Sequence, residues 1–355
     1  ADITGISFEE DVLANSYIDL NPSYDESQNA YPIRISVKEG TDMTSLAPIF
    51  ELTPGATISP ASGSVQNFTT PVRYTVTSED KAWHRVYAIT AREQKASNIP
   101  TTYHFEKVRI MQNVWQEFYE EQDSGNELTW ASGNKGFKWA MSEAATEDYP
   151  TTQIDNGKTG KCVKLETRLT GDLGNMVGMP IAAGNLFIGS FDMLNAITNP
   201  LSATRFGTPF YNKPLRLTGY YKYKAGEQFY ENGEYTSRKD IFNIYAIFYD
   251  GVKYDSAGKG TDVTLDGNLP NQNYEHSSMV ALALVSNPQE TEGDEWKFFD
   301  IPFDYQRYGK KIDEARLAKG EYKIGIIFAS SKDGATFEGA PGSTLLIDEV
   351  ELIYE

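Results

Sequence analysis

The segment at residues 342–355 limits the fold of this chain more than any other stretch. It reads Gly-Ser-Thr-Leu-Leu-Ile-Asp-Glu-Val-Glu-Leu-Ile-Tyr-Glu, an apolar run with an acidic pair in its middle. β-Branched and aromatic residues in such a run are typical of a strand. An earlier segment, Tyr103-His104-Phe105-Glu106, opens a long β-rich stretch. The two segments predict a β-module that begins near residue 103 and closes on its last strand.

The composition of the whole chain also favours strands over helices. Aromatic residues make up 13% of the 355 residues, with 22 tyrosines, while 29 glycines and 16 prolines supply turns. The length suffices for two domains with adequate cores. We therefore expect an all-β protein with long loops.

The charge narrows the classes of partner. The net charge is −18, which repels phosphate backbones and argues against nucleic acid as a partner.

Cys162 is the only cysteine, so no intrachain disulfide is expected, and its alternating surroundings suggest a strand residue. No apolar run is long enough to predict a transmembrane segment. The three histidines form no zinc motif, and no phosphate-binding loop or serine-hydrolase motif is present.

Residues 1–95 predict an immunoglobulin-like β-sandwich. Apolar and polar residues alternate at 33–38 and 72–77, as in strands with one buried face, and Pro- and Gly-containing turns separate these strands. Trp83, Tyr87 and Ile89 are expected in a final strand that covers the core. The polar stretch that follows, up to residue 102, predicts a linker.

Residues 103–355 predict a larger β jelly roll of the carbohydrate-binding type. Seven or more antiparallel strands with long loops favour this double-sheet architecture. The stretch 310–319 could form one short helix or a turn. The strongest strand patterns lie at residues 186–191, 215–224, 241–250, 280–285, 296–303, 322–331 and 345–354.

Several segments of this module resemble the putative carbohydrate metabolism domain family of Bacteroidetes-type surface proteins. The resemblance covers roughly residues 103–355, and the N-terminal module is similar to the immunoglobulin-like domain that often precedes it. It implies a secreted or outer-membrane protein of glycan-using bacteria, with its signal removed and a lipid anchor upstream. It does not imply a defined reaction or catalytic residue. The segments that carry it are Trp130–Phe137, Ala182–Gly189, Asn199–Gly207, Leu217–Lys224, Phe328–Gly334 and Gly342–Asp348.

A loop rich in Gly, Asn and Ser contains the first candidate ligand site. Trp130 and Trp139 could stack on the C–H face of a sugar, and Asn134 between them could bind hydroxyl groups. The alternative is that both tryptophans cap the sandwich.

The second candidate site lies at residues 204–213. The guanidinium of Arg205 could donate a fork of hydrogen bonds to sugar oxygens, and Tyr211 could stack on a ring. The alternative pairs Arg205 with an acid and buries Phe206 and Phe210.

Glu106 and Asp348 are the candidate metal ligands. In many carbohydrate-binding jelly rolls a calcium ion ties the first strand to the last, and these acids occupy the matching places. Calcium requires six to eight oxygen ligands. Two ordinary solvated acids are the alternative.

Together these features predict a cell-surface protein that binds a poly- or oligosaccharide through loop aromatics. One alternative is a glycoside hydrolase, which would need two carboxylates across a cleft. With 50 Asp and Glu residues, the sequence cannot single out such a pair, so the catalytic residues stay unassigned. A second alternative is an adhesion or structural surface protein, which would expose an apolar patch.

Overall fold

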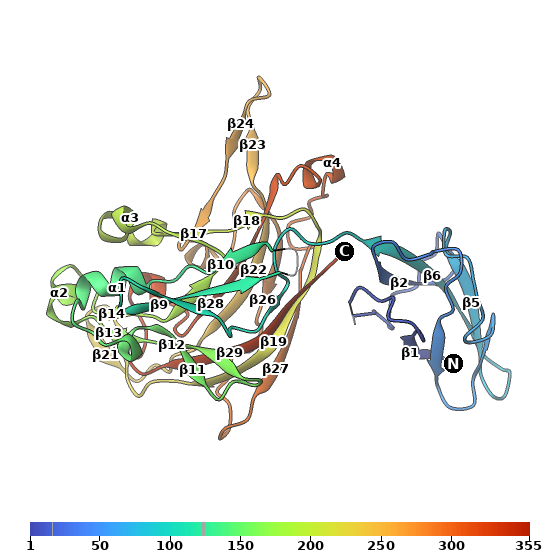
Figure 1. Cartoon of the computed structure of the whole chain (residues 1–355), viewed down its shortest axis with the longest axis horizontal. Coiled ribbons are helices and arrows are strands. Elements are labelled where there is room, and N and C mark those ends of the chain that lie inside the picture. Colours follow the sequence, from blue (N-terminus) through green and yellow to red (C-terminus); the bar gives the residue numbers. More distant parts are fainter. Residues whose placement is uncertain (16, 123–124) are drawn as a thin grey trace. The chain divides into compact units, whose positions relative to one another are not determined.

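The computed structural model describes residues 1–15, 17–122 and 125–355 (Figure 1). The chain divides into two compact units, one formed by residues 1–96 with residue 355 and the other by residues 97–354. Strands dominate both units, which confirms the all-β class. Among the described residues, no helix is both long and apolar enough to cross a membrane.

The N-terminal unit contains a four-stranded sheet and a two-stranded sheet. Ile33, Ile35 and Val37 are buried on one face of the larger sheet, as the alternation predicts. One pair in this sheet, β2 with β6, is parallel, which alternation alone does not reveal. The sheets consist of β2 (Tyr31–Lys38), β6 (His84–Gln94), β5 (Val72–Thr77) and β4 (Thr57–Ser59), and of β1 (Ile3–Ser7) with β3 (Ile49–Leu52).

The expectation for the last strand of this unit was partly wrong. Tyr87 and Ile89 are fully buried in β6, but Trp83 precedes the strand and is 73% exposed. The turn before β6 holds the backbone of Trp83, because its carbonyl accepts a hydrogen bond from the Ser78 amide at 2.9 Å. The Trp83 ring therefore does not cover the core.

The second unit is built on two antiparallel sheets. The first has the order β11 (Thr151–Asp155), β12 (Lys161–Glu166), β29 (Thr344–Tyr354), β19 (Pro214–Lys224), β27 (Lys297–Pro302), with β7 (Thr102–Tyr103) paired to β29. The second has the order β15 (Asn185–Phe187), β28 (Tyr322–Ala329), β22 (Asn243–Asp250), β26 (Met279–Leu284), with β18 (Thr208–Pro209) on β28. From β19 onward the chain passes repeatedly between the two sheets, as in a jelly roll. The pairing of Tyr103 with Val350 confirms that the first and last strands meet.

Strand β22 is buried on both of its faces. Ile244, Ala246 and Phe248 point into the main core between the two sheets. The alternate residues Tyr245 and Ile247 belong to a second apolar cluster on the outer face of the same sheet. Additional chain must therefore cover that outer face, because a solvated face would carry polar residues.

Short elements inserted between the main strands cover the outer faces. Figure 1 shows α1, α2 and α3 gathered on one side of this unit, away from α4. The helices are α1 (Asn134–Ala140), α2 (Gly171–Met176), α3 (Met193–Thr198) and α4 (Glu314–Leu317), the last within the predicted stretch 310–319. The smaller sheets consist of β8 (Val108–Met111), β9 (Trp115–Glu121) and β10 (Glu127–Thr129); β13 (Arg168–Leu169) and β14 (Ile181–Ala182); β16 (Gly189–Phe191), β17 (Thr204–Phe206) and β25 (Leu265–Asp266); β20 (Phe229–Glu231) and β21 (Glu234–Thr236); and β23 (Val252–Tyr254) and β24 (Gly260–Asp262).

Candidate functional site

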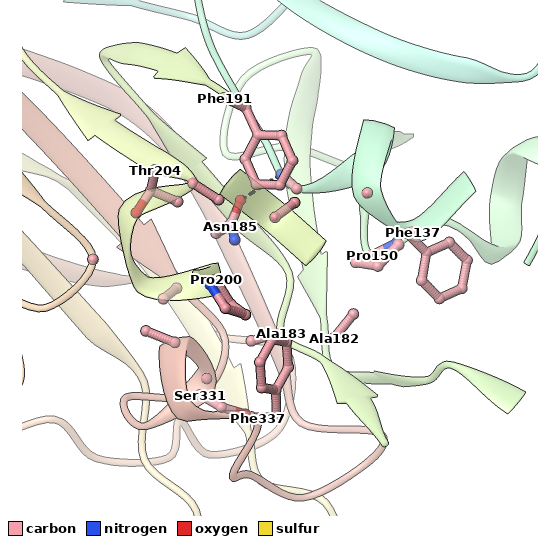
Figure 2. Close-up of a pocket in the computed structure, with 18 of the residues that line it drawn as sticks. Phe137, Pro150, Ala182, Ala183, Asn185, Phe191, Pro200, Thr204, Ser331 and Phe337 are labelled. Carbon is pink, nitrogen blue, oxygen red and sulfur yellow. Dashed lines mark hydrogen bonds between the residues drawn. The ribbon is translucent and has the colours of Figure 1, made fainter. Parts of the chain in front are cut away.

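A cavity of about 170 Å³ lies against the outer face of the second sheet, beneath α1, α2 and α3 (Figure 2). Its floor comes from alternate residues of three strands, and these include Phe187 of β15, Tyr245 of β22 and Ile327 of β28. Because side chains alternate across a sheet, their neighbours Leu186, Ile244 and Phe328 point into the main core instead. The same strands therefore build both the core and the cavity floor.

Helix α1 forms one wall of the cavity and presents Gly136, Phe137 and Trp139 to it. A Cβ atom at position 136 would lie 3.2 Å from the ring of Phe191, so glycine allows this ring to pack closely against the helix. Trp139 is 38% exposed and therefore lies where the cavity meets solvent. Aromatic rings thus surround the space on the α1 side.

Small side chains account for the empty volume. Ala140 of α1, Ala182 of β14 and Ala196 of α3 all line the cavity. Asp192 caps α3, because its Oδ1 accepts hydrogen bonds from the amides of Leu194 (2.9 Å) and Asn195 (3.4 Å). The cap closes the start of this six-residue helix, which lines the cavity with Met193 and Ala196.

Asn185 is the main polar group of the cavity. Its Oδ1 accepts a hydrogen bond from the Gly133 amide at 2.7 Å, and its backbone carbonyl accepts one from Thr151 Oγ1 at 2.8 Å. The bond from Gly133 orients the side-chain amide, and Figure 2 shows its nitrogen directed into the space between Phe191 and Pro200. Nδ2 is available there as a hydrogen-bond donor.

Thr204 supplies a second polar group. Its Oγ1 is buried and has no hydrogen-bond partner among the described residues. A buried hydroxyl without a partner costs free energy. Figure 2 shows this oxygen on the side of Thr204 away from Asn185, so a ligand in the cavity could bond it only after the side chain rotates.

The cavity lacks acidic groups. None of the described residues that line it is Asp, Glu, Arg or His, and Lys332 is its one charged residue. Glycoside hydrolysis ordinarily uses two carboxylates on either side of the scissile bond. The described lining therefore offers binding groups without that acid–base pair.

A buried carboxylate supports the cavity from behind. Asp240 Oδ2 accepts hydrogen bonds from Ser331 Oγ (2.5 Å), Ser343 Oγ (2.7 Å) and the Ala340 amide (2.8 Å). Burial raises the pKa of Asp240, and these donors oppose the rise. Ser331 also lines the cavity, so this network fixes the segment that carries Lys332 and Phe337.

Trp130 and Asn134, two of the predicted sugar contacts, have structural roles instead. Trp130 is 1% exposed and packs against Tyr103, with ring centroids 5.0 Å apart. Asn134 is fully buried, and it bonds the backbone of Thr151 through both its Nδ2 (2.7 Å) and its Oδ1 (3.1 Å). A ring enclosed in the core and an amide consumed by backbone groups have no face left for a sugar.

The other three predicted contacts do not form one site. Trp139 lines the cavity, but Arg205 is exposed on the opposite face of β17 from the cavity-lining residues Thr204 and Phe206. Tyr211 is 43% exposed and packs near Gly320, just after α4, whose position in Figure 1 is far from α1. Sequence proximity therefore did not indicate which of these residues share a site.

Glu106 and Asp348 converge on the turn that precedes β12. Glu106 Oε1 accepts a hydrogen bond from the Lys161 amide at 2.8 Å, and Asp348 Oδ2 accepts one from the Thr159 amide at 3.0 Å. A Cβ atom at Gly160 would clash with Glu106 Oε1, so glycine permits the close approach. The turn thus joins the start of the module to its last strand.

Burial opposes the charge of Asp348. The side chain is fully buried, and burial raises its pKa to about 6, against the opposing hydrogen bonds from the backbone amides of Thr159, Glu349 and Lys158. Among the described residues, no three His, Cys, Asp or Glu side chains gather as a metal-ligand group. A calcium ion at this turn would therefore need backbone carbonyls in addition to the two carboxylates.

A second hollow, of about 490 Å³, lies between the edge strands β26 and β27. Asp300 and Asp304 line it, together with the exposed ring of Phe298. Asp300 Oδ1 accepts a hydrogen bond from Arg216 Nε at 2.6 Å, and Asp304 Oδ1 accepts one from the Gln306 amide at 2.9 Å. Asp148 and Glu166 line another hollow, of about 360 Å³, so carboxylates come together in more than one hollow of the described chain.

The sequence had named neither Asn185 nor Thr204 as a site residue. A signal was present, since both lie in segments that carried the family resemblance, Ala182–Gly189 and Asn199–Gly207. Nothing in those segments indicated that they approach α1 from the other side of a cavity.

Comparisons with known proteins agree with this architecture. Residues 104–353 match the family described as "Putative carbohydrate metabolism domain". Residues 19–91 match "SGBP, N-terminal", the N-terminal domain of Bacteroidetes surface glycan-binding proteins. No curated protein matches the chain.

Two similar crystal structures are each described as a putative glycoside hydrolase. The one from Bacteroides thetaiotaomicron has 44% sequence identity and a TM-score of 0.65, and the match covers 100% of this chain and 96% of that chain. The one from Bacteroides vulgatus has 50% identity and a TM-score of 0.68, and the match covers 73% of this chain and 100% of that chain.

Proposed function

Because this chain belongs to the putative carbohydrate metabolism domain family, we propose that it binds a saccharide at the cavity beneath α1–α3 without cleaving it. Its function is related to glycans, as both family matches indicate. The observation that carries the proposal is the lining of the cavity, in which aromatic rings and a fixed amide donor occur without Asp or Glu among the described residues. Such a lining can stack on a sugar and bind its hydroxyls but cannot supply an acid and a base.

The N-terminal unit supports a location at the cell surface. Its match to the N-terminal domain of surface glycan-binding proteins suggests that it displays the second unit towards external polysaccharide. In this proposal the protein is secreted to the outer membrane and held there by a lipid anchor upstream of residue 1.

The first test is binding of the full chain to a broad glycan array with calcium present. We expect retention of one glycan class, and weaker retention of the Trp139→Ala variant. Arg205→Ala is the matched control, because Arg205 lies outside the cavity lining. Equal retention of the wild type and Trp139→Ala would remove the cavity from the binding site.

Glycoside hydrolysis is the alternative function. It is favoured by the description of the two similar structures and by the hollow that Asp300 and Asp304 line. The test is release of reducing ends from any glycan retained on the array. Release that Asp300→Asn and Asp304→Asn abolish, while Trp139→Ala does not, would establish hydrolysis in the second hollow.

We also propose a structural calcium ion at the turn that Glu106 and Asp348 share. The support is a buried carboxylate with a raised pKa beside a second carboxylate, at the junction of the first and last strands. The ion would compensate the charge of Asp348 and fix this junction. It would have no part in contact with the glycan.

A further inference from the structure

The lining of the cavity is more apolar than a bare sugar requires. A pyranose presents several hydroxyl groups, and each one buried without a partner costs free energy. Among the described lining residues, the polar groups without a hydrogen bond from the protein include Asn185 Nδ2, Asn243 Oδ1, Thr204 Oγ1 and the hydroxyl of Tyr245. Most other lining residues are aromatic, aliphatic or glycine. The inner part of the cavity therefore suits a ligand with few polar atoms.

The size and shape of the lining indicate a flat ring. The cavity measures about 170 Å³, and an apolar protein cavity of about 150 Å³ is known to hold benzene. Phe191 and Phe337 stand around it and Tyr245 lies in its floor, while the ring of Phe137 at its edge packs against Tyr149. Aromatic rings pack favourably edge to face or offset against one another, which favours an aryl group over a linear acyl chain.

The charge of the lining indicates a neutral ligand. No Arg, His, Asp or Glu occurs among the described lining residues, and Lys332 is exposed rather than enclosed. A charged group placed in such a space would be desolvated without a partner. An ester-linked aryl group is neutral, and its carbonyl oxygen can accept the hydrogen bond that Asn185 Nδ2 has left to donate.

We infer that the cavity binds an aromatic acyl ester on the sugar, with the aryl ring inside and the saccharide at the mouth near Trp139. This inference rests on the proposed glycan-binding function and specifies its ligand class. The half-exposed Trp139 ring provides a stacking surface where the sugar would emerge. Thr204 Oγ1, once its side chain has rotated, would bond a ring substituent such as a phenolic hydroxyl.

The direct test is calorimetric binding of methyl ferulate, a neutral ester of an aromatic acid, to the full chain, with methyl β-glucoside as the bare-sugar probe. We expect methyl ferulate to bind with a Kd of about 1 mM or tighter, and methyl β-glucoside to bind at least tenfold more weakly. Absence of methyl ferulate binding at ten times that concentration would overturn the inference.

Cavity-filling variants locate the binding. Ala196→Leu on α3 should weaken methyl ferulate binding at least tenfold, while Leu194→Ala on the same helix should not, because Leu194 is 83% exposed and lies outside the lining. Ala140→Leu fills the same space from α1 and replaces Ala196→Leu if that variant does not fold. Unchanged binding in a folded filling variant would place the aryl ester elsewhere and overturn the inference.

Thr204→Val separates a ligand contact from a structural role. Because Thr204 Oγ1 has no partner among the described residues, valine should leave the melting temperature unchanged or raise it. The same change should weaken methyl ferulate binding severalfold. A loss of stability together with unchanged binding would exclude the hydroxyl from the ligand site.

A pair of glycans distinguishes failure of this inference from failure of the proposed function. The pair is feruloylated arabinoxylan oligosaccharide and the same preparation after alkaline saponification. Preference for the esterified form, lost in Ala196→Leu, supports both proposals. Equal binding of both forms overturns the inference and leaves glycan binding intact. Binding of methyl ferulate but of neither form, nor of any glycan on the array, counts against the proposed function and therefore also against an ester carried by a sugar.

Discussion

The interior of the jelly roll and the cavity share strands β22 and β28, yet only the interior is fully filled. Ile244 and Phe248 meet large side chains from the opposite sheet, and all of these are buried. On the other face, Tyr245 meets the small residues of α1 and α3 across an open space. The difference shows how a rigid frame can carry a binding site: covering segments with small side chains leave room, while the packed face holds the strands in place.

The largest effect that this comparison predicts is on Trp130. Replacement by alanine should lower the free energy of unfolding by about 3–5 kcal/mol, because it leaves a cavity among Tyr103, Phe105 and Phe328. Chemical denaturation of the full chain measures this loss. A change in the free energy of unfolding of less than about 1 kcal/mol would mean that Trp130 does not stabilise the core.

The stability of the second unit should also depend on calcium, through Asp348. If the turn binds the ion, calcium at about 100 times its Kd should add about 2.7 kcal/mol to the free energy of unfolding. Asp348→Asn should lose this gain, and magnesium should not replace calcium, because the smaller ion demands stricter geometry. Melting curves with calcium, magnesium or a chelator test this. A melting temperature of the wild type that does not respond to calcium would refute the calcium proposal.

Trp139 should behave in the opposite way from Trp130. Trp139→Ala should weaken glycan binding at least tenfold, or about 1.4 kcal/mol, because the ring lies at the mouth of the cavity. Its melting temperature should stay close to that of the wild type, since the ring is 38% exposed. Loss of stability without loss of glycan affinity would mean that Trp139, like Trp130, has a structural role.

Asp240 should give the smallest effect, visible as pH dependence. Because burial raises the pKa of this carboxyl in the folded protein, the folded state binds the proton more tightly than the unfolded chain. This contribution to stability is fully present below the ordinary carboxyl pKa, and it is lost as the pH rises through the raised pKa. The stability of the wild type relative to Asp240→Asn should therefore increase as the pH is lowered from 7 towards 4. A difference that is constant with pH would contradict the raised pKa.

Much of the β framework could be predicted because strands leave a local pattern. The predicted strand at 215–224 corresponds to β19, and that at 345–354 corresponds to β29, each within one residue at the start. The predicted strand at 186–191 is split at residue 188 into β15, which pairs with β28, and β16, which pairs with β17. Local alternation cannot show which strands are neighbours, so the parallel pair β2–β6 was not foreseen.

The cavity could not be predicted, because its residues come from many separate segments. Trp130 and Trp139 lie nine positions apart in one Gly-rich stretch, yet one is in the core and the other lines the cavity. Their burial depends on contacts with residues up to two hundred positions away, such as Phe328 for Trp130. Composition suggested aromatic ligand contacts but could not assign them to one face.

The position of β29 has a consequence for biosynthesis. This strand, at residues 344–354, lies between β12 and β19, so it pairs on both sides within its sheet. A nascent chain that has not yet delivered these residues leaves two hydrophobic strand edges open, and such edges invite aggregation. The second unit can therefore complete its sheet only once residues 344–354 are in place, and a variant in which this strand is deleted should yield an insoluble product.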